Sequence, residues 1–252
     1  MSAIKIEFAV EVRKDDSNYA DTLRKALENM GRLEEIDLEK GRVIIQTQRP
    51  WSEVHNLIES TGHKAVLSGF GGQSAVAVIN TTGSVVDRTP VQGVVRFTTI
   101  TNNAPGMVVD GVVDGLNPGT HGLYVHESGD ISRGCASVGG TYNPRDSPPT
   151  ERPAGDLGQI QADADGRATF RFVASVLEVW DIIGRAVVIT DKSKISSDQD
   201  PKNQGDERIA CGIIARSAGI LQNFKRICAC DGINLWDERN KPAAGKGRSQ
   251  KL

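Results

Sequence analysis

The feature that most constrains the fold is a change of hydrophobic period near residue 74. Before it, segments with strand period and helix period alternate along the chain. After it, short apolar strands are separated by Gly, Pro, Asn and Asp as far as residue 216, with almost no helical pattern. The sequence therefore predicts an α+β multidomain protein. A small α/β unit comes first, and an all-β Greek-key sandwich or barrel follows it.

The first unit contains the element order β-α-β-β-α-β over residues 1–67, which is typical of a ferredoxin-like domain. Leu23 and Leu27 lie on one face of the first helix, and we expect Gly31 to be its C′ residue. Ser52 is the expected N-cap of the second helix. Strands are predicted at residues 4–12, 36–38, 43–47 and 64–67. Residues 68–74 have the Gly-rich composition of a linker.

The second unit is predicted to cover residues 75–224. Its clearest strands are residues 91–98, 107–114, 122–126, 159–162, 168–172, 184–190 and 210–216. Residues 225–252 are polar and hold seven Lys or Arg against three Asp or Glu, so we expect a flexible tail. Each folded unit of this 252-residue chain is long enough to bury its own core.

Composition excludes several classes of function. The net charge is −2 and only 5% of residues are aromatic, which gives no reason to expect nucleic acid or an anionic membrane as partner. No apolar run approaches the roughly 20 residues of a membrane span. The first ten residues alternate polar and apolar, unlike a signal peptide. We therefore expect a cytoplasmic protein, in which a structural disulfide is unusual.

Two of the four cysteines, Cys228 and Cys230, are separated by one residue in the predicted tail. In an extended backbone both side chains point the same way, so they could chelate one ion. Two thiolates suit Cu(I) or Zn, and the pair could also exchange with disulfides, because a bond between the two would be strained. From spacing alone, two ordinary thiols on a frayed end are an equally good interpretation.

The second unit resembles Cu,Zn superoxide dismutase over nearly its whole length. The resemblance lies in segments 119–130, 134–135, 142–144, 155–158, 162–166, 183–185 and 208–212. With a ferredoxin-like unit before it and Cys-x-Cys after it, the whole chain resembles the family of copper chaperones for superoxide dismutase. Segments 211–219 and 228–232 are particularly similar to that family.

This resemblance implies that the dismutase metal sites are degenerate. The dismutase family binds copper with four histidines and zinc with three histidines and an aspartate. The corresponding positions here are Tyr124, His126, Thr141, Asp156 and Thr190, and the zinc loop at residues 145–154 has no histidine. One imidazole and one carboxylate cannot form either site, so we expect neither dismutase activity nor zinc.

The first unit departs from the chaperone family in the same way. That family usually has Met-x-Cys-x-x-Cys after the first strand, and here Lys14 and Ser17 stand where the two cysteines would be. An ammonium repels a cation, and a hydroxyl is too hard a ligand to replace a thiolate for Cu(I). We therefore expect no copper site in the first unit.

For function, the resemblance implies a metallochaperone that carries Cu(I) on Cys228 and Cys230. It would deliver the ion to immature Cu,Zn superoxide dismutase and promote formation of that partner's disulfide by thiol exchange. The two proteins would form a heterodimer that mimics the dismutase dimer, and the chain could also form a homodimer with itself. The expected interface is formed by Gly129, residues 183–185 and the segment 213–216, and its named residues are Gly129, Ile183, Gly184, Arg185, Ile214 and Arg216. Two alternatives are a metal-free thiol–disulfide oxidoreductase and an interaction protein for the same partner.

The resemblance also implies roles for other residues. Cys135 and Cys211 match an intrasubunit disulfide, the alternative being two buried free thiols. His121 and His126 are expected to be hydrogen-bonded and not ligands, and Arg208 to make structural hydrogen bonds. The remaining two histidines, His55 and His63, are expected at the surface. The family implies a mainly cytoplasmic protein with a further pool in the mitochondrial intermembrane space.

Overall fold

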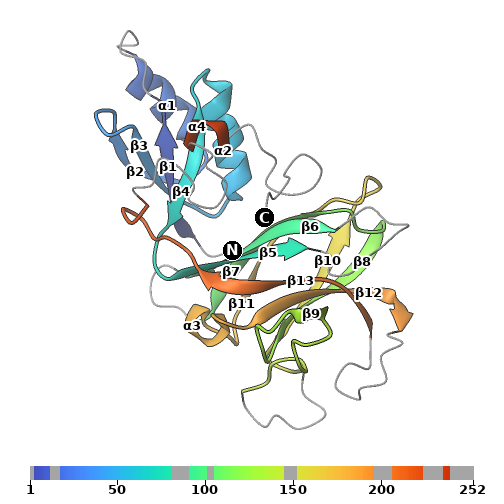
Figure 1. Cartoon of the computed structure of the whole chain (residues 1–252). Coiled ribbons are helices and arrows are strands. Elements are labelled where there is room, and N and C mark those ends of the chain that lie inside the picture. Colours follow the sequence, from blue (N-terminus) through green and yellow to red (C-terminus); the bar gives the residue numbers. More distant parts are fainter. Residues whose placement is uncertain are drawn as a thin grey trace.

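The first domain has the predicted βαββαβ order, shown in blue and cyan in Figure 1. The computed structural model describes residues 3–11, 18–80, 91–100, 105–144, 152–195, 206–223 and 235–238. The elements of the first domain are β1 (Ile4–Val10), α1 (Tyr19–Leu27), β2 (Arg32–Asp37), β3 (Arg42–Thr47), α2 (Trp51–Ser60) and β4 (Ala65–Phe70). The sheet order is β2-β3-β1-β4. Alternate residues of β1, such as Ile6 and Phe8, form one core with Leu23 of α1 and Ile58 of α2, so both helices cover the same face.

Two helix ends differ from the sequence prediction. Helix α1 ends at Leu27, too early for Gly31 to be its C′ residue. Gly31 instead has a φ of +151°, and a Cβ there would lie 2.2 Å from a backbone oxygen of β3, so close strand approach explains the glycine. Helix α2 begins at Trp51 with Pro50 at the N-cap position, so Ser52 already lies within the helix.

The predicted linker at residues 68–74 is mostly strand. Strand β4 continues to Phe70, which is buried in the first core, and β5 (Ser74–Asn80) begins the second sheet. One of the glycines that suggested a linker, Gly69, accommodates another stretch of backbone. A Cβ on Gly69 would lie 2.6 Å from the carbonyl oxygen of Gly219. Glycine within a strand often marks such an approach of a second chain segment.

The second domain is an eight-stranded antiparallel sheet in the order β10-β8-β12-β13-β5-β6-β7-β11. Its two end strands, β10 and β11, approach each other, so the sheet nearly closes into the predicted barrel. Besides β5, the elements are β6 (Gln92–Thr99), β7 (Met107–Asp114), β8 (Gly119–His126), β9 (Ser132–Cys135), β10 (Asp156–Ala162), β11 (Ala168–Ala174), α3 (Val179–Ile182), β12 (Ala186–Ile195) and β13 (Asp206–Arg216). All seven predicted strands are present, whereas β5 and β9 were not predicted. None of the described helices is long and apolar enough to cross a membrane.

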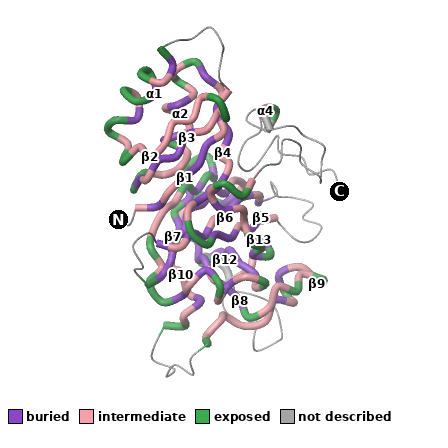
Figure 2. Tube along the Cα trace, turned by 90° about the vertical axis from the view of Figure 1, so that its left-hand side faces the viewer, coloured by how far each residue is buried: buried purple, intermediate pink, exposed green. Residues whose placement is uncertain are grey.

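The barrel interior is the main core of the second domain. Inward-facing residues such as Phe97, Leu123 and Val187 pack with Leu177 and Ile182, which come from the region of α3. Figure 2 shows this buried interior running through the strands of the barrel, with exposed positions mainly on the outside and in the loops. A smaller cluster around Cys135 and Cys211 joins the loop that contains β9 to β12 and β13.

The two domains are joined by buried contacts on the outer face of β6 and β7. Val108 of β7 belongs to the core of the first domain, and the Arg96 guanidinium lies 4.9 Å from the Trp51 ring of α2. Beside them Asp110 and Arg171 form a buried ion pair at 3.0 Å. Burial raises the pKa of Asp110, while the neighbouring Arg171 charge and a backbone hydrogen bond from Trp51 oppose that rise. These contacts fix the first domain against the barrel.

After β13 the chain returns to the first domain. Gly219 forms a parallel bridge with Phe70, and the short helix α4 (Leu235–Glu238) contacts β4. Figure 1 shows α4, in red, beside the blue and cyan domain. The predicted flexible tail therefore contains one described helix. The other tail residues lie outside the part of the chain that the structure describes.

Candidate functional site

The loop at residues 127–140 is tied to the barrel by a disulfide. Cys135, at the end of β9, is bonded to Cys211 of β13 across a sequence separation of 76 residues, with their Cα atoms 5.8 Å apart. This is the pairing that the resemblance implied. Both residues are nearly inaccessible and pack with Val138, Ala186 and Val188. The bond therefore fixes the loop against β12 and β13.

Arg208 of β13 holds the same loop through its guanidinium. One nitrogen donates to the carbonyl oxygen of Cys135 and another to that of Gly139, each at 2.9 Å. Hydrogen bonds from a charged donor are stronger than neutral ones. Arg208 thus has the structural hydrogen-bonding role that was predicted for it.

His126, at the end of β8, faces this loop and is buried. Its Nδ1 lies 3.0 Å from the carbonyl oxygen of Gly139, and its backbone forms an isolated bridge with Thr141. Burial, reinforced by the positive charge of Arg208, lowers the pKa of His126 from 6.5 to about 4, although the hydrogen bond to Gly139 opposes the shift. The imidazole is therefore neutral at physiological pH. It is also hydrogen-bonded to protein, which is the part that was predicted.

Side chains fill the space around the other substituted copper positions. A Cβ built on Gly122 of β8 would lie 2.4 Å from the Tyr124 ring and 2.5 Å from the Thr190 hydroxyl. The phenol ring and the hydroxyl therefore occupy the volume above Gly122. The Thr190 hydroxyl is buried and has no hydrogen-bond partner among the residues that the structure describes. This position on the outer face of the barrel offers a phenol and a hydroxyl, which are poor ligands for a redox copper ion.

Asp156, the remaining zinc-type position, is held by protein groups. Its two carboxylate oxygens accept hydrogen bonds from Arg152, at 2.5 and 2.8 Å, and one of them also accepts from the Gly158 amide at 3.0 Å. The carboxylate raises the pKa of Arg152, consistent with a bidentate ion pair. Among the described residues, no three His, Cys, Asp or Glu side chains gather as a metal-binding cluster.

Three expected interface residues lie together beside β12. The built Cβ of Gly129 would lie 2.3 Å from the carbonyl oxygen of Gly184, so the loop passes directly over residues 183–185. Arg185 points back into its own domain: it donates to the carbonyl oxygens of Asp181 at 2.7 Å and Glu127 at 2.6 Å, and stacks on Tyr142 at 3.5 Å. Arg185 therefore supports this surface and does not present a free charge to a partner.

The prediction that Ile214 lies at the interface was wrong, because its side chain is fully buried in the barrel core. Successive strand residues face opposite sides, so the neighbouring Ile213 points outward and is 43% exposed. The register of β13 with β5 places Ile213 opposite Val78, which is also 43% exposed. Arg216, at the end of the strand, is exposed. The alternation of β5 and β13 was the signal that could have identified Val78 and Ile213.

We call this continuous surface, formed by Gly129, residues 183–185, Ile213 and Val78, the belt. Its segments are joined by backbone hydrogen bonds. The Gly184 amide donates to the carbonyl oxygen of Ile214 at 2.9 Å, and the Ile214 amide donates to that of Arg185 at 2.8 Å. The belt is thus a firmly held face with an apolar centre.

The other predicted site residues either lie outside the described part of the chain or are hydrogen-bonded within the protein. Cys228, Cys230, Lys14 and Ser17 lie outside the described residues. His121 is buried, with its Nε2 2.8 Å from the carbonyl oxygen of Asn117, as expected of a hydrogen-bonded residue.

The expectation of two surface histidines was wrong. His63 is buried, with its ring centre 3.7 Å from that of Tyr19 in α1. His55 is partly buried in α2, where its Nε2 lies 3.0 Å from the carbonyl oxygen of Ala65. Both residues are enclosed because the helices of the first domain pack onto its sheet, a contact that residue type alone does not indicate.

The barrel and its disulfide-bonded loop define a dismutase-type fold. The described positions that would bind metal in a dismutase do not hold the dismutase ligand set. The family model for copper/zinc superoxide dismutase matches residues 91–214. The chain is 41% identical over 270 residues to a copper chaperone for superoxide dismutase from Sus scrofa, covering 99% of this chain and 94% of that protein. It is 41% identical over 263 residues to the Homo sapiens protein of the same name, covering 97% and 92%. A superoxide dismutase 1 copper chaperone from Saccharomyces cerevisiae is 29% identical over 236 residues, covering 90% and 91%. The chain belongs to the family of copper chaperones for superoxide dismutase.

Proposed function

We propose that this protein carries Cu(I) as cargo on Cys228 and Cys230 and delivers it to immature Cu,Zn superoxide dismutase. It recognises that client by forming a heterodimer in which the second domain replaces one dismutase subunit. A two-fold dimer interface uses the same patch on both sides, so a domain of the same fold can occupy one half of it. Family membership supports copper and the dismutase as cargo and client. We also propose that the protein acts in the cytoplasm, with a further pool in the mitochondrial intermembrane space.

The observation that carries the proposal is the contrast between the belt and the metal positions. Val78 and Ile213 remain exposed and apolar on a firmly held face, as a docking surface requires. The positions that would bind metal in a dismutase are instead filled by Tyr124, or bonded to protein as in Asp156. The domain therefore keeps a surface suited to an interface, while the side chains at its dismutase-type metal positions are not a ligand set for catalysis.

Docking makes transfer from two thiolates selective. Once the heterodimer forms, the tail thiols act at an effective concentration of about millimolar for a short flexible connection. Transfer then depends on the client's ligands and not on a high intrinsic selectivity of Cys-x-Cys. The neighbouring Lys225 and Arg226 favour the thiolate form electrostatically.

The same pair can promote the client's disulfide when it is oxidised. A client thiolate attacks one tail sulfur, which forms a mixed disulfide and releases the other tail cysteine as a thiolate. The second client thiolate then displaces the tail. The client loses two electrons, the tail gains them, and an oxidant of the dioxygen class has to restore the tail disulfide. Without any copper transfer, this route alone is the alternative function of a thiol–disulfide oxidoreductase.

The docking part is tested with Ile213→Asp, which places an unpaired carboxylate at the centre of the belt. We expect the affinity for immature dismutase to fall by about 30-fold or more, since burying an unpaired charge costs several kcal/mol. The matched control is Val173→Asp, because Val173 is similarly exposed, at 40%, on β11. Co-elution and calorimetry with the client measure binding, and Cu(I) content should remain that of the wild type. Equal affinities for both variants and the wild type would overturn the heterodimer proposal.

A further inference from the structure

The segment that leads to the thiols is bound along the edge of the first domain. The Ile220 amide donates to the carbonyl oxygen of Phe70 at 3.1 Å, and the Asn223 side-chain amide donates to that of Ser68 at 3.1 Å. These bonds run along β4, which would otherwise be an open edge of the sheet. We call residues 217–223 the returning segment. It covers an edge whose backbone groups need partners.

Glycines make room for this contact. A Cβ on Gly69 would lie 2.6 Å from the Gly219 carbonyl oxygen, a backbone atom that cannot move aside easily. A Cβ on Gly71, just after β4, would lie 2.6 Å from the Cβ of Lys5 in β1 and 3.3 Å from the side chain of Ile220. The returning segment thus fits closely against β4 because Gly69 has no side chain there.

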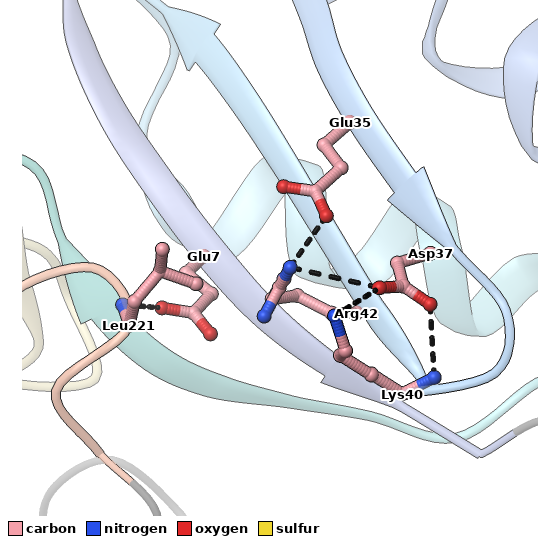
Figure 3. A network of polar contacts seen from close by, with 6 residues as sticks. All are labelled: Glu7, Glu35, Asp37, Lys40, Arg42 and Leu221. Carbon is pink, nitrogen blue, oxygen red and sulfur yellow. Dashed lines mark hydrogen bonds and ion pairs between the residues drawn. The ribbon is translucent and has the colours of Figure 1, made fainter.

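A buried carboxylate completes the attachment. Glu7 of β1 is 6% exposed, and its Oε2 accepts a hydrogen bond of 2.7 Å from the amide of Leu221. Leu221 has a φ of +61°, which is rare for a residue other than glycine, so this turn depends on its surroundings. Figure 3 shows Glu7 pointing at Leu221, with Arg42 of β3 on the same sheet between Glu35 and Asp37. The Glu7 carboxylate also contributes to the raised pKa of Arg42, so the two groups interact electrostatically.

The chain contacts the same strand again after the thiols, because α4 contacts β4. Asn223 precedes Cys228 by five residues, and Leu235 follows Cys230 by five. An extended chain spans at most about 3.5 Å per residue, so each of these five-residue connections can span at most about 18 Å. The two attachments to the first domain therefore limit the reach of the segment between them.

We propose that the first domain, through Glu7 and the glycine edge of β4, positions the Cys-x-Cys segment for its client. The inference rests on the proposed function for the identity of the client, but the attachment itself does not. Glu7 is a positioning residue, because it acts on the thiols through Leu221. This gives the first domain a task that requires no metal ligand of its own.

The experiment uses the full-length protein with Glu7→Ala or Gly69→Ala. The control, Glu34→Ala, removes a carboxylate from the same sheet, where Glu34 pairs with Lys5 at 2.7 Å. We expect amide exchange at Leu221 to accelerate about tenfold or more when its charged acceptor is lost. Spin labels on Cys228 and on an introduced Lys25→Cys in α1, with Cys230→Ser, should show a broadened distance distribution in both test variants. Glu34→Ala should match the wild type in both measurements.

A third measurement is the rate of client activation, compared with the thermal midpoint of each variant. Slower activation with unchanged copper content and an unchanged midpoint supports positioning. Unchanged Leu221 exchange and label distances in both test variants would overturn the attachment. Altered distances with a wild-type activation rate would overturn the positioning role. If the wild type itself fails to activate the client, the proposed function fails, and the exchange and distance data still decide the attachment.

Discussion

Acidification should weaken the second domain through His126, because this imidazole is buried and bonded to the loop that presents Gly129. In the unfolded chain the pKa of His126 returns to its ordinary value of 6.5, whereas in the folded protein it is about 4. The unfolded state therefore binds the proton more readily in this pH range. The contribution of His126 to the free energy of unfolding is fully present above pH 6.5 and is lost as the pH falls toward 4.

The size of the effect follows from the two pKa values. Lowering the pKa from 6.5 to about 4 corresponds to about 3 kcal/mol, at about 1.4 kcal/mol per pH unit. His126 is only 3% exposed, so solvent screening does not reduce this appreciably. Since the titration is incomplete at pH 4.5, we expect a loss of roughly 2 kcal/mol between pH 7 and pH 4.5. That is a substantial part of a typical domain stability of about 5–15 kcal/mol.

Urea denaturation at pH 7 and pH 4.5, with wild type and His126→Gln, measures this loss. The glutamine amide can still donate to the carbonyl oxygen of Gly139 but does not titrate. The wild type should lose roughly 2 kcal/mol more than the variant between the two pH values. Equal losses in both proteins would refute the assignment of the acid sensitivity to this histidine.

Three further predictions concern stability and copper. Replacing Cys135 and Cys211 by alanine should lower the free energy of unfolding by about 4.5 kcal/mol from the chain entropy of a 76-residue loop, and a loss under about 1 kcal/mol in urea denaturation would contradict this. Asp110→Ala leaves a buried guanidinium uncompensated and should cost about 3–5 kcal/mol in the same assay, whereas a neutral result would remove its role between the domains. Lys14→Ala and Ser17→Ala should leave the Cu(I) content unchanged, and a reduced content would place copper in the first domain.

Local pattern was sufficient to predict the βαββαβ order of the first domain and the all-β class of the second. Alternation identified seven strands of the second domain but not β5 or β9, and the family motifs implied the Cys135–Cys211 bond. The predictions were wrong for residues whose surroundings are formed by a segment that is distant in the sequence. Gly69 suggested a linker because its sequence neighbours do not reveal that Gly219 lies against it. His63 suggested a surface residue because only tertiary packing brings Tyr19 onto its ring.

The predicted interface shows that sequence alone also does not give the orientation of a single side chain. The resemblance places the segment that contains Ile213 and Ile214 at a dimer surface but does not give the orientation of each side chain. The pleat of β13 decides that Ile214 enters the core and that Ile213 faces outward beside Val78. A shift of one residue exchanges the inner and outer sets, so register has to be known before a docking residue can be chosen.

The central claim is that copper is carried on the tail and not in either folded domain. The most direct measurement is the Cu(I) stoichiometry of the reduced full-length protein and of Cys228→Ser/Cys230→Ser, each dialysed against a competing Cu(I) chelator. The wild type should retain about one Cu(I) per chain, as expected for two thiolates sharing one ion, and the double variant should retain none. A double variant that kept its copper under the chelator would contradict the account.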